Sequence, residues 1–346
     1  MRQADTGTRN MTTITDIARR LGVSNATVSK ALNGAPDISP ETAEKVRRTA
    51  AEMEYLPNAT ARTLKLGRSN SIGVLFVDKT GSGLSHEYFS RILESIKSES
   101  EQRGYDITLI TKDIGSFRMD YLDHVNYRRC DGVVIASVDF TDPSVIRLVE
   151  SPVPTVTLDR VVPGHTAIMS DNATGMASLV RLVYEKGHRR IAFIHGEDTY
   201  VTQTRLQAFR AACSALGIPQ PDTYLRPGPY HDTAASARET ALLMRLPEPP
   251  TCILYPDDYS YIGGMNELER MGLSVPKDVS AAGFDGIPLG QVLRPRLTTY
   301  RQDTDRIGRL AAQKLIEQIE RPEEYTPEVF TLPGELLPGK TVASAA

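Results

Sequence analysis

The sequence predicts an all-α head joined by a short hinge helix to a large α/β body of two parallel-sheet subdomains. Residues 11–57 contain three short helical patterns, each preceded by a residue that commonly caps helices. From residue 70 onward, apolar runs of strand length alternate with helical patterns, which is typical of parallel sheets covered by helices on both faces. The charge is divided in the same way: residues 1–68 carry 11 Lys and Arg against 7 Asp and Glu, or +4, while the whole chain carries −3.

A basic head on an acidic body indicates that the head meets a polyanion, although solvated helix faces also collect Lys and Arg. The three cysteines are far apart and odd in number. They fit neither a disulfide framework nor a zinc site, and they favour a reduced, cytoplasmic compartment. No apolar run reaches the length that spans a membrane, and residues 1–10 lack the apolar core of a signal peptide. We expect residues 1–10 to be a disordered extension.

The first two helices of the head are joined by a tight turn. Thr13 can cap the first helix in a capping box with Asp16, and Gly22 is expected to end it. Ser24 is expected to cap the second helix and Ser39 the third. This arrangement over residues 11–57 is typical of a helix-turn-helix, whose second helix enters the major groove of DNA.

The outer face of the second helix is rich in hydrogen-bonding groups. Asn25 and Lys30 can reach base edges, whereas Thr27, Ser29 and Asn33 suit phosphate oxygens. The alternative is that all five are ordinary capping and surface residues. The three helices together favour DNA binding.

A hinge helix and linker are predicted at residues 58–69, because Pro57 prevents the third helix from continuing. Asn58 can cap residues 59–64, a helix so short that it needs a second subunit or DNA to form. Leu64 has no core nearby, so in a DNA-binding hinge it can wedge between base steps of the minor groove. The alternative is a linker residue that packs on the next domain.

Residues 13–67 resemble the N-terminal region of the LacI/GalR family of bacterial transcription regulators. The segments that carry the resemblance are "ITDIARRLGVSNATVSKALNG" and "ISPETAEKVRRTAAEMEYLPNATARTLKLG". The resemblance implies base reading by Asn25, Ala26 and Lys30. It implies backbone contacts by Thr13, Thr27, Ser29, Asn33, Ser39, Tyr55 and Asn58, and minor-groove contacts by Ala61 and Leu64. Many members carry Arg at the position of Lys30, and Lys cannot form the same planar fork of hydrogen bonds.

Polar residues stand at the ends of several predicted strands of the body, where parallel α/β folds bind their ligands. Asp159 ends one strand, Arg205 is expected at the start of a helix, the pair Asp257 and Asp258 follows "TCILY", and Asp285 ends "AAGFD". Carboxylates accept hydrogen bonds from sugar hydroxyls, and a guanidinium donates a fork of them. Each Asp can instead cap the helix or turn that follows.

The body, residues 70–346, resembles the periplasmic-binding-protein-like (type I) effector domain of the same family. The resemblance lies in "KGHRRIAFIHG", "PDDYSYIGGMNELERMGLSVPKDVSAAGFDG" and "PRLTTYRQDTDRIGRLAAQKLIEQI". It implies a first subdomain of about 70–168 plus 303–325 and a second of about 169–300 plus 326–346. The expected effector-binding residues are Tyr88, Phe89, Asp159, Arg205, Asp257, Tyr259, Asp285 and Gln302.

Two departures from the family pattern affect the expected partners. The family usually has Asn-Asp where this chain has Asp257 and Asp258, and the extra carboxylate favours a ligand with hydroxyls or a basic group. The C-terminal segment has no leucine heptads, so a tetramer-forming tail is not supported and a homodimer is expected.

The resulting hypothesis is a dimeric, cytoplasmic transcription regulator, most simply a repressor, that binds a pseudo-palindromic operator and responds to a small sugar. A purine- or nucleoside-responsive regulator of the same fold is the alternative. A solute-binding protein is disfavoured by the head, and an enzyme by the lack of a nucleophile–base arrangement. The six histidines show no metal-ligand spacing, and we expect no metal and no cofactor.

Overall fold

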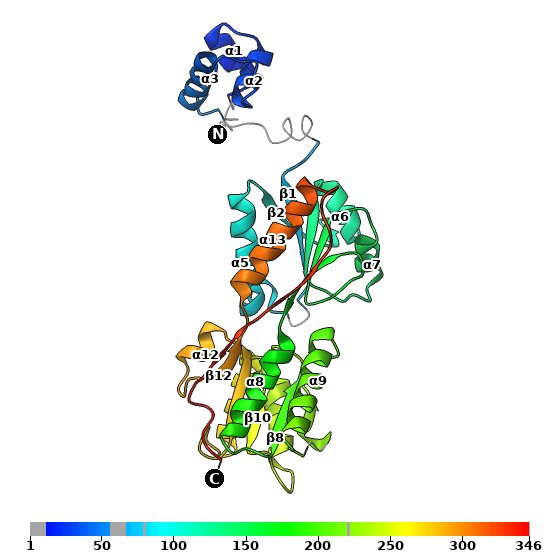
Figure 1. The fold of residues 1–346 in the computed structure, drawn as a ribbon, viewed down its shortest axis with the longest axis vertical. Helices are drawn as coiled ribbons and strands as arrows, with labels where there is room; N and C mark the ends of the chain where they lie inside the picture. Colours follow the sequence, from blue (N-terminus) through cyan, green and yellow to red (C-terminus); the bar gives the residue numbers. More distant parts are fainter. Residues whose placement is uncertain (1–11, 56–66, 79–80, 220–221, 346) are drawn as a thin grey trace, which may run out of the picture. The chain divides into compact units, whose positions relative to one another are not determined.

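The computed structural model describes residues 12–55, 67–78, 81–219 and 222–345. The chain divides into two compact units, residues 1–69 and 70–346, which are called the head and the body below. Figure 1 shows the elements of both units in chain order.

The described helices of the head are α1 (Ile14–Leu21), α2 (Asn25–Leu32) and α3 (Pro40–Glu52). Thr13 and Asp16 form the predicted capping box, and Gly22 ends α1 at a left-handed φ of 69°, where glycine carries no Cβ penalty. Ser24 and Ser39 cap α2 and α3, as predicted.

The head has a small core of its own. Ile17 of α1, Val28 of α2 and Val46 of α3 are fully buried against one another, with Ala31 completing the contact between α2 and α3. Because this core uses the inner face of α2, the polar residues of that helix are left on its outer face.

The body consists of two lobes, each with a six-stranded sheet. The first sheet is entirely parallel, in the order β13-β7-β6-β5-β1-β2. Its strands are β1 (Ser71–Phe76), β2 (Asp106–Ile110), β5 (Gly132–Ser137), β6 (Thr155–Leu158), β7 (Thr166–Ser170) and β13 (Val329–Leu332). Its helices are α5 (Glu87–Gln102), α6 (Tyr121–Arg128), α7 (Pro143–Val149) and α13 (Thr304–Glu320), with a 3-10 turn η1 (Gly83–Ser85) and a small hairpin of β3 (Asp113–Ile114) and β4 (Phe117–Arg118).

The second sheet has the order β14-β12-β11-β10-β8-β9 and is parallel except for β14, which runs antiparallel to β12. Its strands are β8 (Ile191–His195), β9 (Leu225–Pro227), β10 (Cys252–Leu254), β11 (Ser280–Asp285), β12 (Thr298–Arg301) and β14 (Glu335–Leu337). Its helices are α8 (Asn172–Glu185), α9 (Tyr200–Ala215), α10 (Thr233–Met244), α11 (Asp258–Arg270) and α12 (Pro288–Val292), with a 3-10 turn η2 (Asp222–Tyr224).

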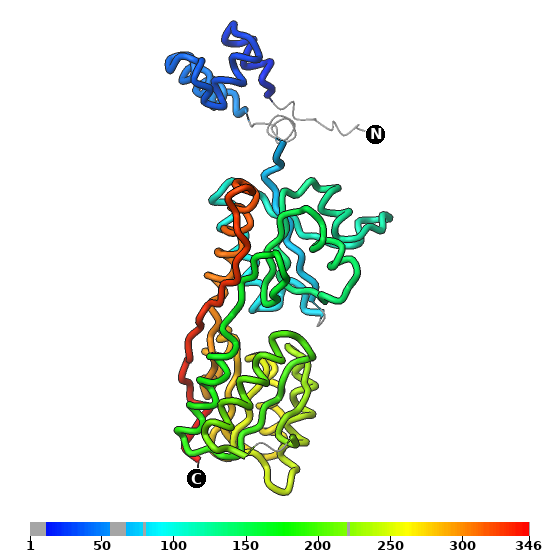
Figure 2. Tube along the Cα trace, turned by 45° about the vertical axis from the view of Figure 1, so that its right-hand side comes forward, coloured from blue at the N-terminus to red at the C-terminus, as the bar shows by residue number. Residues whose placement is uncertain are grey.

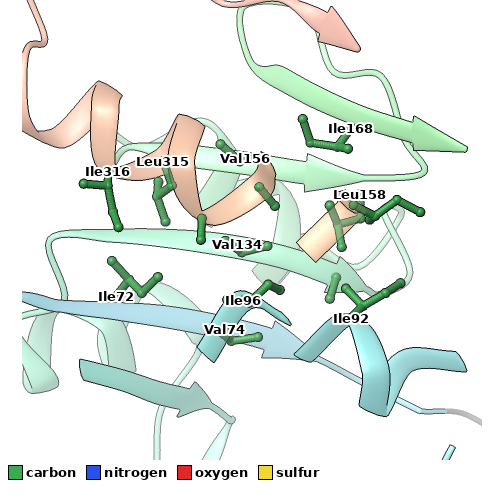
Figure 3. Close-up of a cluster of buried hydrophobic side chains, with 14 of the residues drawn as sticks. Ile72, Val74, Ile92, Ile96, Val134, Val156, Leu158, Ile168, Leu315 and Ile316 are labelled. Carbon is green, nitrogen blue, oxygen red and sulfur yellow. The ribbon is translucent and has the colours of Figure 1, made fainter. Parts of the chain in front are cut away.

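Helices cover both faces of each sheet, so the strands are buried on both sides. In the first lobe, Ile92 and Ile96 of α5 and Leu315 of α13 pack on Val134 and neighbouring strand residues (Figure 3). Helices α6 and α7 cover the other face. In the second lobe, α8 and α9 cover one face and α10 and α11 the other. This double cover explains the continuous apolar strands in the sequence.

Figures 1 and 2 show the chain passing between the lobes after β7, after β12 and after β13. The third crossing corrects the expected subdomain boundary, because residues 326–346 do not all belong to the second lobe. Val329–Leu332 form β13 at the edge of the first sheet, where Phe330 is in register with Ile168 of β7. Backbone pairing with a distant strand decides this placement, and the second lobe regains the chain only at β14.

Candidate DNA interface and effector cleft

The proposed base-reading residues lie together on the outer face of α2. Asn25, Ala26 and Lys30 are all exposed. Asn25 donates a hydrogen bond from Nδ2 to Oγ1 of Thr15 at 3.2 Å, and Lys30 donates one from Nζ to a carboxylate oxygen of Asp37. Sequence reasoning did not identify Thr15 or Asp37, since both contacts come from outside α2.

The residues proposed to contact the DNA backbone have local roles in the structure. Thr13 and Ser39 cap helices, the Oγ1 atom of Thr27 lies 2.9 Å from Oγ of Ser24, and Asn33 donates from Nδ2 to the carbonyl of Ser29 at 2.6 Å. Tyr55 packs against the core of the head, and burial raises the pKa of its hydroxyl. Asn58, Ala61 and Leu64 lie outside the described residues.

A cavity of about 590 Å³ opens at the junction of the two lobes of the body. Both lobes line it. The first lobe contributes α5, the ends of β5 and β6 and the loops that follow β1, β5 and β6, and the second contributes α9, the end of β11 and the loops that follow β8, β9, β10 and β12. Seven of the eight expected effector residues line this cavity, namely Tyr88, Phe89, Asp159, Arg205, Asp257, Asp285 and Gln302. The cavity therefore lies at the carboxyl ends of both parallel sheets, as the fold class predicts.

Arg205 is the buried cation of this cavity, with a relative exposure of 3%. It donates from Nε to Oδ1 of Asn172 at 2.7 Å and from Nη1 to the carbonyl of Pro256 at 2.8 Å. Its guanidinium carbon lies 3.6 Å from the ring centroid of Phe284. The sequence predicted that Arg205 lies at the start of a helix, and this prediction is wrong. Helix α9 begins at Tyr200 after the Thr199 cap, so Arg205 lies within the helix.

A chain of polar contacts between residues that line the cavity links the two lobes. Gln302 donates from Nε2 to Oδ1 of Asp285 at 2.6 Å, and Tyr88 of the first lobe donates to Oε1 of Gln302 at 3.3 Å. The Nη2 atom of Arg205 lies 4.0 Å from Oδ1 of Asp285. Burial nevertheless raises the pKa of the Asp285 carboxyl to about 8, although Arg205 acts in the opposite direction.

Two further carboxylates of the cavity, Asp159 and Asp257, accept hydrogen bonds from backbone amides. Asp159 accepts a hydrogen bond from the amide of Ser170 at 3.2 Å, and burial raises its pKa. Asp257 caps α11 by accepting from the amide of Ser260 at 2.7 Å, and it also accepts from the amide of His231 at 2.8 Å. Asp257 therefore both caps a helix and lines the cavity, so the two readings of its role are compatible.

At this site the structure decides the open alternative for Asp258 and corrects the expectation for Tyr259. Asp258 does not line the cavity: it is 1% exposed, and its carboxylate accepts from Thr299 Oγ1 at 2.5 Å and from the amide of Ile287 at 2.8 Å. Asp258 therefore has a structural role in the second lobe. The extra carboxylate relative to the family pattern is Asp257, which stands where the family usually has Asn, and Asp257 lines the cavity. Tyr259 is also absent from the cavity lining, because its ring stacks on His231.

Several cavity residues were not found from the sequence. Tyr230 lines the cavity and its hydroxyl lies 2.9 Å from Oγ1 of Thr202, while Phe140 and Arg160 contribute an aromatic and a cationic side chain from the first lobe. The signal for Tyr230 was its position just after β9, but a strand of three residues is too short to show a pattern. Phe140 lies in the loop after β5, where periodicity gives no guidance.

Within the described ranges, no group of three or more His, Cys, Asp and Glu side chains is arranged to hold a metal ion. In the same part of the chain, no helix has the length and apolar character needed to cross a membrane.

Comparison with known proteins identifies both units. Residues 13–58 match the family model "Bacterial regulatory proteins, lacI family", and residues 180–342 match "Periplasmic binding protein-like domain". The probable HTH-type transcriptional repressor ExuR of Bacillus subtilis (strain 168) is 34% identical over 324 residues, which cover 92% of this chain and 95% of that protein. The chain belongs to the LacI family.

Two other members of the LacI family illustrate its range. The ribose operon repressor of Escherichia coli (strain K12) is 31% identical over 90% of this chain and 94% of its own length. The HTH-type transcriptional repressor PurR of Vibrio vulnificus (strain CMCP6) is 29% identical over 96% of this chain and 99% of its own length. This chain is a transcriptional repressor of the LacI family, and its relatives are repressors and not enzymes.

The fold agrees with solved structures of the LacI family. The lac repressor dimer bound to operator and the anti-inducer ONPF matches with a TM-score of 0.82 at 25% identity, covering 96% of this chain and all of that one. Members of the family thus bind operator DNA and small-molecule effectors, and the two units of this chain correspond to those two tasks.

Proposed function

We propose that this repressor acts as a homodimer on a pseudo-palindromic operator and that a small sugar bound in the interlobe cavity controls its operator affinity. The observation that carries the proposal is the position of Arg205, Asp257 and Asp285 around one cavity of about 590 Å³. These groups combine donors and acceptors, which a ligand with several hydroxyls satisfies. The ribose operon repressor among its relatives supports a sugar as the effector class.

Both lobes line the cavity, so a ligand that contacts both binds differently when the angle between the lobes changes. Such a ligand shifts the balance between lobe arrangements by the difference between its affinities for them. We propose that the hinge at residues 58–69 passes this shift to the head, with Ala61 and Leu64 in the minor groove.

In the head, we propose that Asn25, Ala26 and Lys30 read bases. Thr13, Thr27, Ser29, Asn33, Ser39, Tyr55 and Asn58 would then hold the register on the phosphate backbone. The exposure of Asn25, Ala26 and Lys30 on the outer face of α2 supports their contact with DNA.

A purine or nucleoside effector is the second candidate, and the aromatic lining of the cavity favours it. Phe89 and Phe140 line the first-lobe side, and Tyr200 and Tyr230 the second-lobe side, so a planar base has rings to stack on. The relatives named PurR support this candidate.

A thermal-shift screen of the full chain against monosaccharides, disaccharides, nucleosides and purine bases tests the proposal. A bound ligand raises the melting temperature because it binds only the folded state. Each hit is then tested for its effect on binding to an operator selected from a library of random pseudo-palindromes, measured by fluorescence anisotropy. Sugars that bind and change operator affinity support the proposal. Binding of purines or nucleosides alone shows that the effector belongs to that class and not to the sugars. Ligands that bind without changing operator affinity overturn effector control.

A further inference from the structure

Four aromatic rings contact one another in series across the junction of the two lobes, one pair edge-to-face and two pairs stacked. In the first lobe, Phe89 of α5 contacts His86, which precedes α5, with ring centroids 5.0 Å apart. His86 stacks on His231 of the second lobe at 4.2 Å with an interplanar angle of 24°. His231 stacks in turn on Tyr259 of α11 at 3.9 Å and 8°. His86 and His231 therefore form one of the contacts between the two lobes.

A hydrogen bond joins the lobes at the same place. The Oγ atom of Ser82, just before η1 in the first lobe, lies 3.0 Å from Nδ1 of His231. His231 is thus held by one side chain through its ring face and by another through its ring nitrogen. The two contacts together restrain both the distance between the lobes and the rotation of the His231 ring.

His231 is also tied to the cavity itself. Its amide donates to Oδ2 of Asp257, a carboxylate that lines the cavity. Its φ of 60° lies in the left-handed region, which Asn, Asp and His tolerate better than most other side chains. This backbone conformation directs the amide to Asp257 while the ring reaches the first lobe.

The partner histidine lies at the cavity wall. His86 is 7% exposed, it lines the cavity, and its Nδ1 atom is buried with no hydrogen-bond partner among the residues that the structure describes. An unsatisfied buried nitrogen is costly. A ligand hydroxyl that reaches this nitrogen would stabilise His86 in the position from which it stacks on His231.

We propose that His231 is a positioning residue that couples the ligand cavity to the angle between the lobes. Opening of the lobes must separate the His231 ring from His86 and break the bond to Ser82, while Asp257 ties the same residue to the cavity. The proposal rests on the proposed function in one respect, since it gives a physical basis for the ligand-dependent lobe movement.

Pulsed EPR on the full chain tests this proposal without a ligand. Spin labels are attached at Ile146→Cys on α7 of the first lobe and Leu242→Cys on α10 of the second, both exposed positions. Cys130 is replaced by Ser, while Cys213 and Cys252 are buried and their thiol pKa values are raised. Labelled chain is diluted with unlabelled chain so that distances within one subunit dominate.

Two substitutions remove the contact between the lobes. His231→Asn keeps a residue that tolerates the left-handed backbone but removes the ring, and His86→Ala removes the opposing ring. We expect both to broaden the distance distribution and shift it to longer distances relative to the parent chain. His86→Phe supplies a stacking ring without the nitrogen atoms and should give the narrow distribution of the parent chain. This rescue is not expected if His86→Ala acts only by disturbing the fold of the first lobe.

His195→Ala is the matched control, because the Nδ1 atom of His195 lies 2.9 Å from the carbonyl of Gly196 within the second lobe. It should leave the distribution unchanged. Distributions for His231→Asn and His86→Ala that match the parent overturn the proposal, as does a failure of His86→Phe to rescue the loss in a folded chain. Failure of every sugar to bind would overturn the proposed function and would leave this ligand-free result standing.

Discussion

Lys30 donates a hydrogen bond from Nζ to the carboxylate of Asp37, which lies in the turn between α2 and α3. This bond lowers the pKa of Asp37. Both side chains are about half exposed, at 51% and 53%, so the pair is weak and DNA can compete for the ammonium group. Asp37 therefore has two effects on the proposed base-reading residue: it orients Lys30 and it must release or share Lys30 when DNA binds.

The first prediction concerns operator binding. Lys30→Ala should weaken binding to the selected operator by about 1–3 kcal/mol, the usual value of one good side-chain contact to a base, and leave effector affinity unchanged. Fluorescence anisotropy with the operator and with a scrambled duplex of equal length separates loss of base reading from loss of charge. An unchanged operator affinity would show that Lys30 does not contact the DNA.

Asp37→Asn is the informative comparison for this prediction. It removes the carboxylate that competes with DNA while Lys30 remains, so binding to the scrambled duplex should rise and the preference for the operator should fall. If Asp37→Asn changes the affinity for neither duplex, Asp37 has no part in recognition.

The second prediction concerns Arg205. Its guanidinium bonds Asn172 and the Pro256 carbonyl inside the protein, so Arg205→Ala leaves buried acceptors without donors. We expect a loss of about 3–5 kcal/mol in the free energy of unfolding, together with loss of the thermal shift caused by a screened ligand. Urea unfolding and the same thermal-shift assay measure the two effects.

Arg160→Ala provides the control for Arg205, since Arg160 also lines the cavity but is exposed. Its substitution should change stability by no more than about 0.5 kcal/mol. If a folded Arg205→Ala chain still shows the full increase in melting temperature with the ligand, Arg205 is not an effector-binding residue.

The third prediction is a pH dependence set by Asp285. Burial raises its pKa in the folded chain from 3.8 to about 8, so the folded state holds a proton that the unfolded state releases. The stability that protonation of Asp285 contributes to the folded state is fully present below the pKa of this carboxyl in the unfolded chain. It is lost as the pH rises through about 8, the pKa in the folded chain. The wild-type free energy of unfolding should therefore fall relative to that of Asp285→Asn by up to about 1.4 kcal/mol per pH unit across this window.

Urea unfolding of both chains at a series of pH values across that window checks this sign. The Asn variant keeps the size of the side chain but cannot titrate, so the difference between the two curves isolates one carboxyl. A difference that stays constant with pH would mean that Asp285 is ionised throughout in the folded chain.

The fourth prediction tests the packing of α5 on α13. A Cβ added at Gly308 would lie 2.4 Å from the carbonyl oxygen of Ile92 and 2.6 Å from Cβ of Ser95, and backbone cannot yield as a flexible side chain can. Gly308→Ala should cost about 1–3 kcal/mol of stability despite the higher helix propensity of Ala. Arg309→Ala, on the exposed side of α13, is the control and should change stability by about 0.5 kcal/mol or less. Equal urea midpoints for the two variants would contradict this close approach.

Much of the local structure of this protein could be predicted from its sequence. Caps at Thr13, Ser24 and Ser39 mark the helices of the head because capping depends on a few consecutive residues. Apolar runs mark the strands because both faces of each sheet are covered. The carboxylates at Asp159 and Asp285 could be assigned to one site, since parallel strands bring their carboxyl ends to the same edge.

Tertiary contacts decided what these local signals left open. Asp257 and Asp258 are adjacent in the chain, yet one lines the cavity and the other is buried against Thr299, because successive residues at a helix start point in different directions. His86 and His231 are separated by most of the body, and only the two lobe folds bring their rings to 4.2 Å. The sequence by itself determined many of the elements, the family and seven of the residues that line the cavity, because these depend on short-range pattern and strand polarity. The tertiary structure alone decided which carboxylate lines the cavity, which lobe holds β13 and where the lobes touch, because those outcomes depend on pairing between segments far apart in the chain.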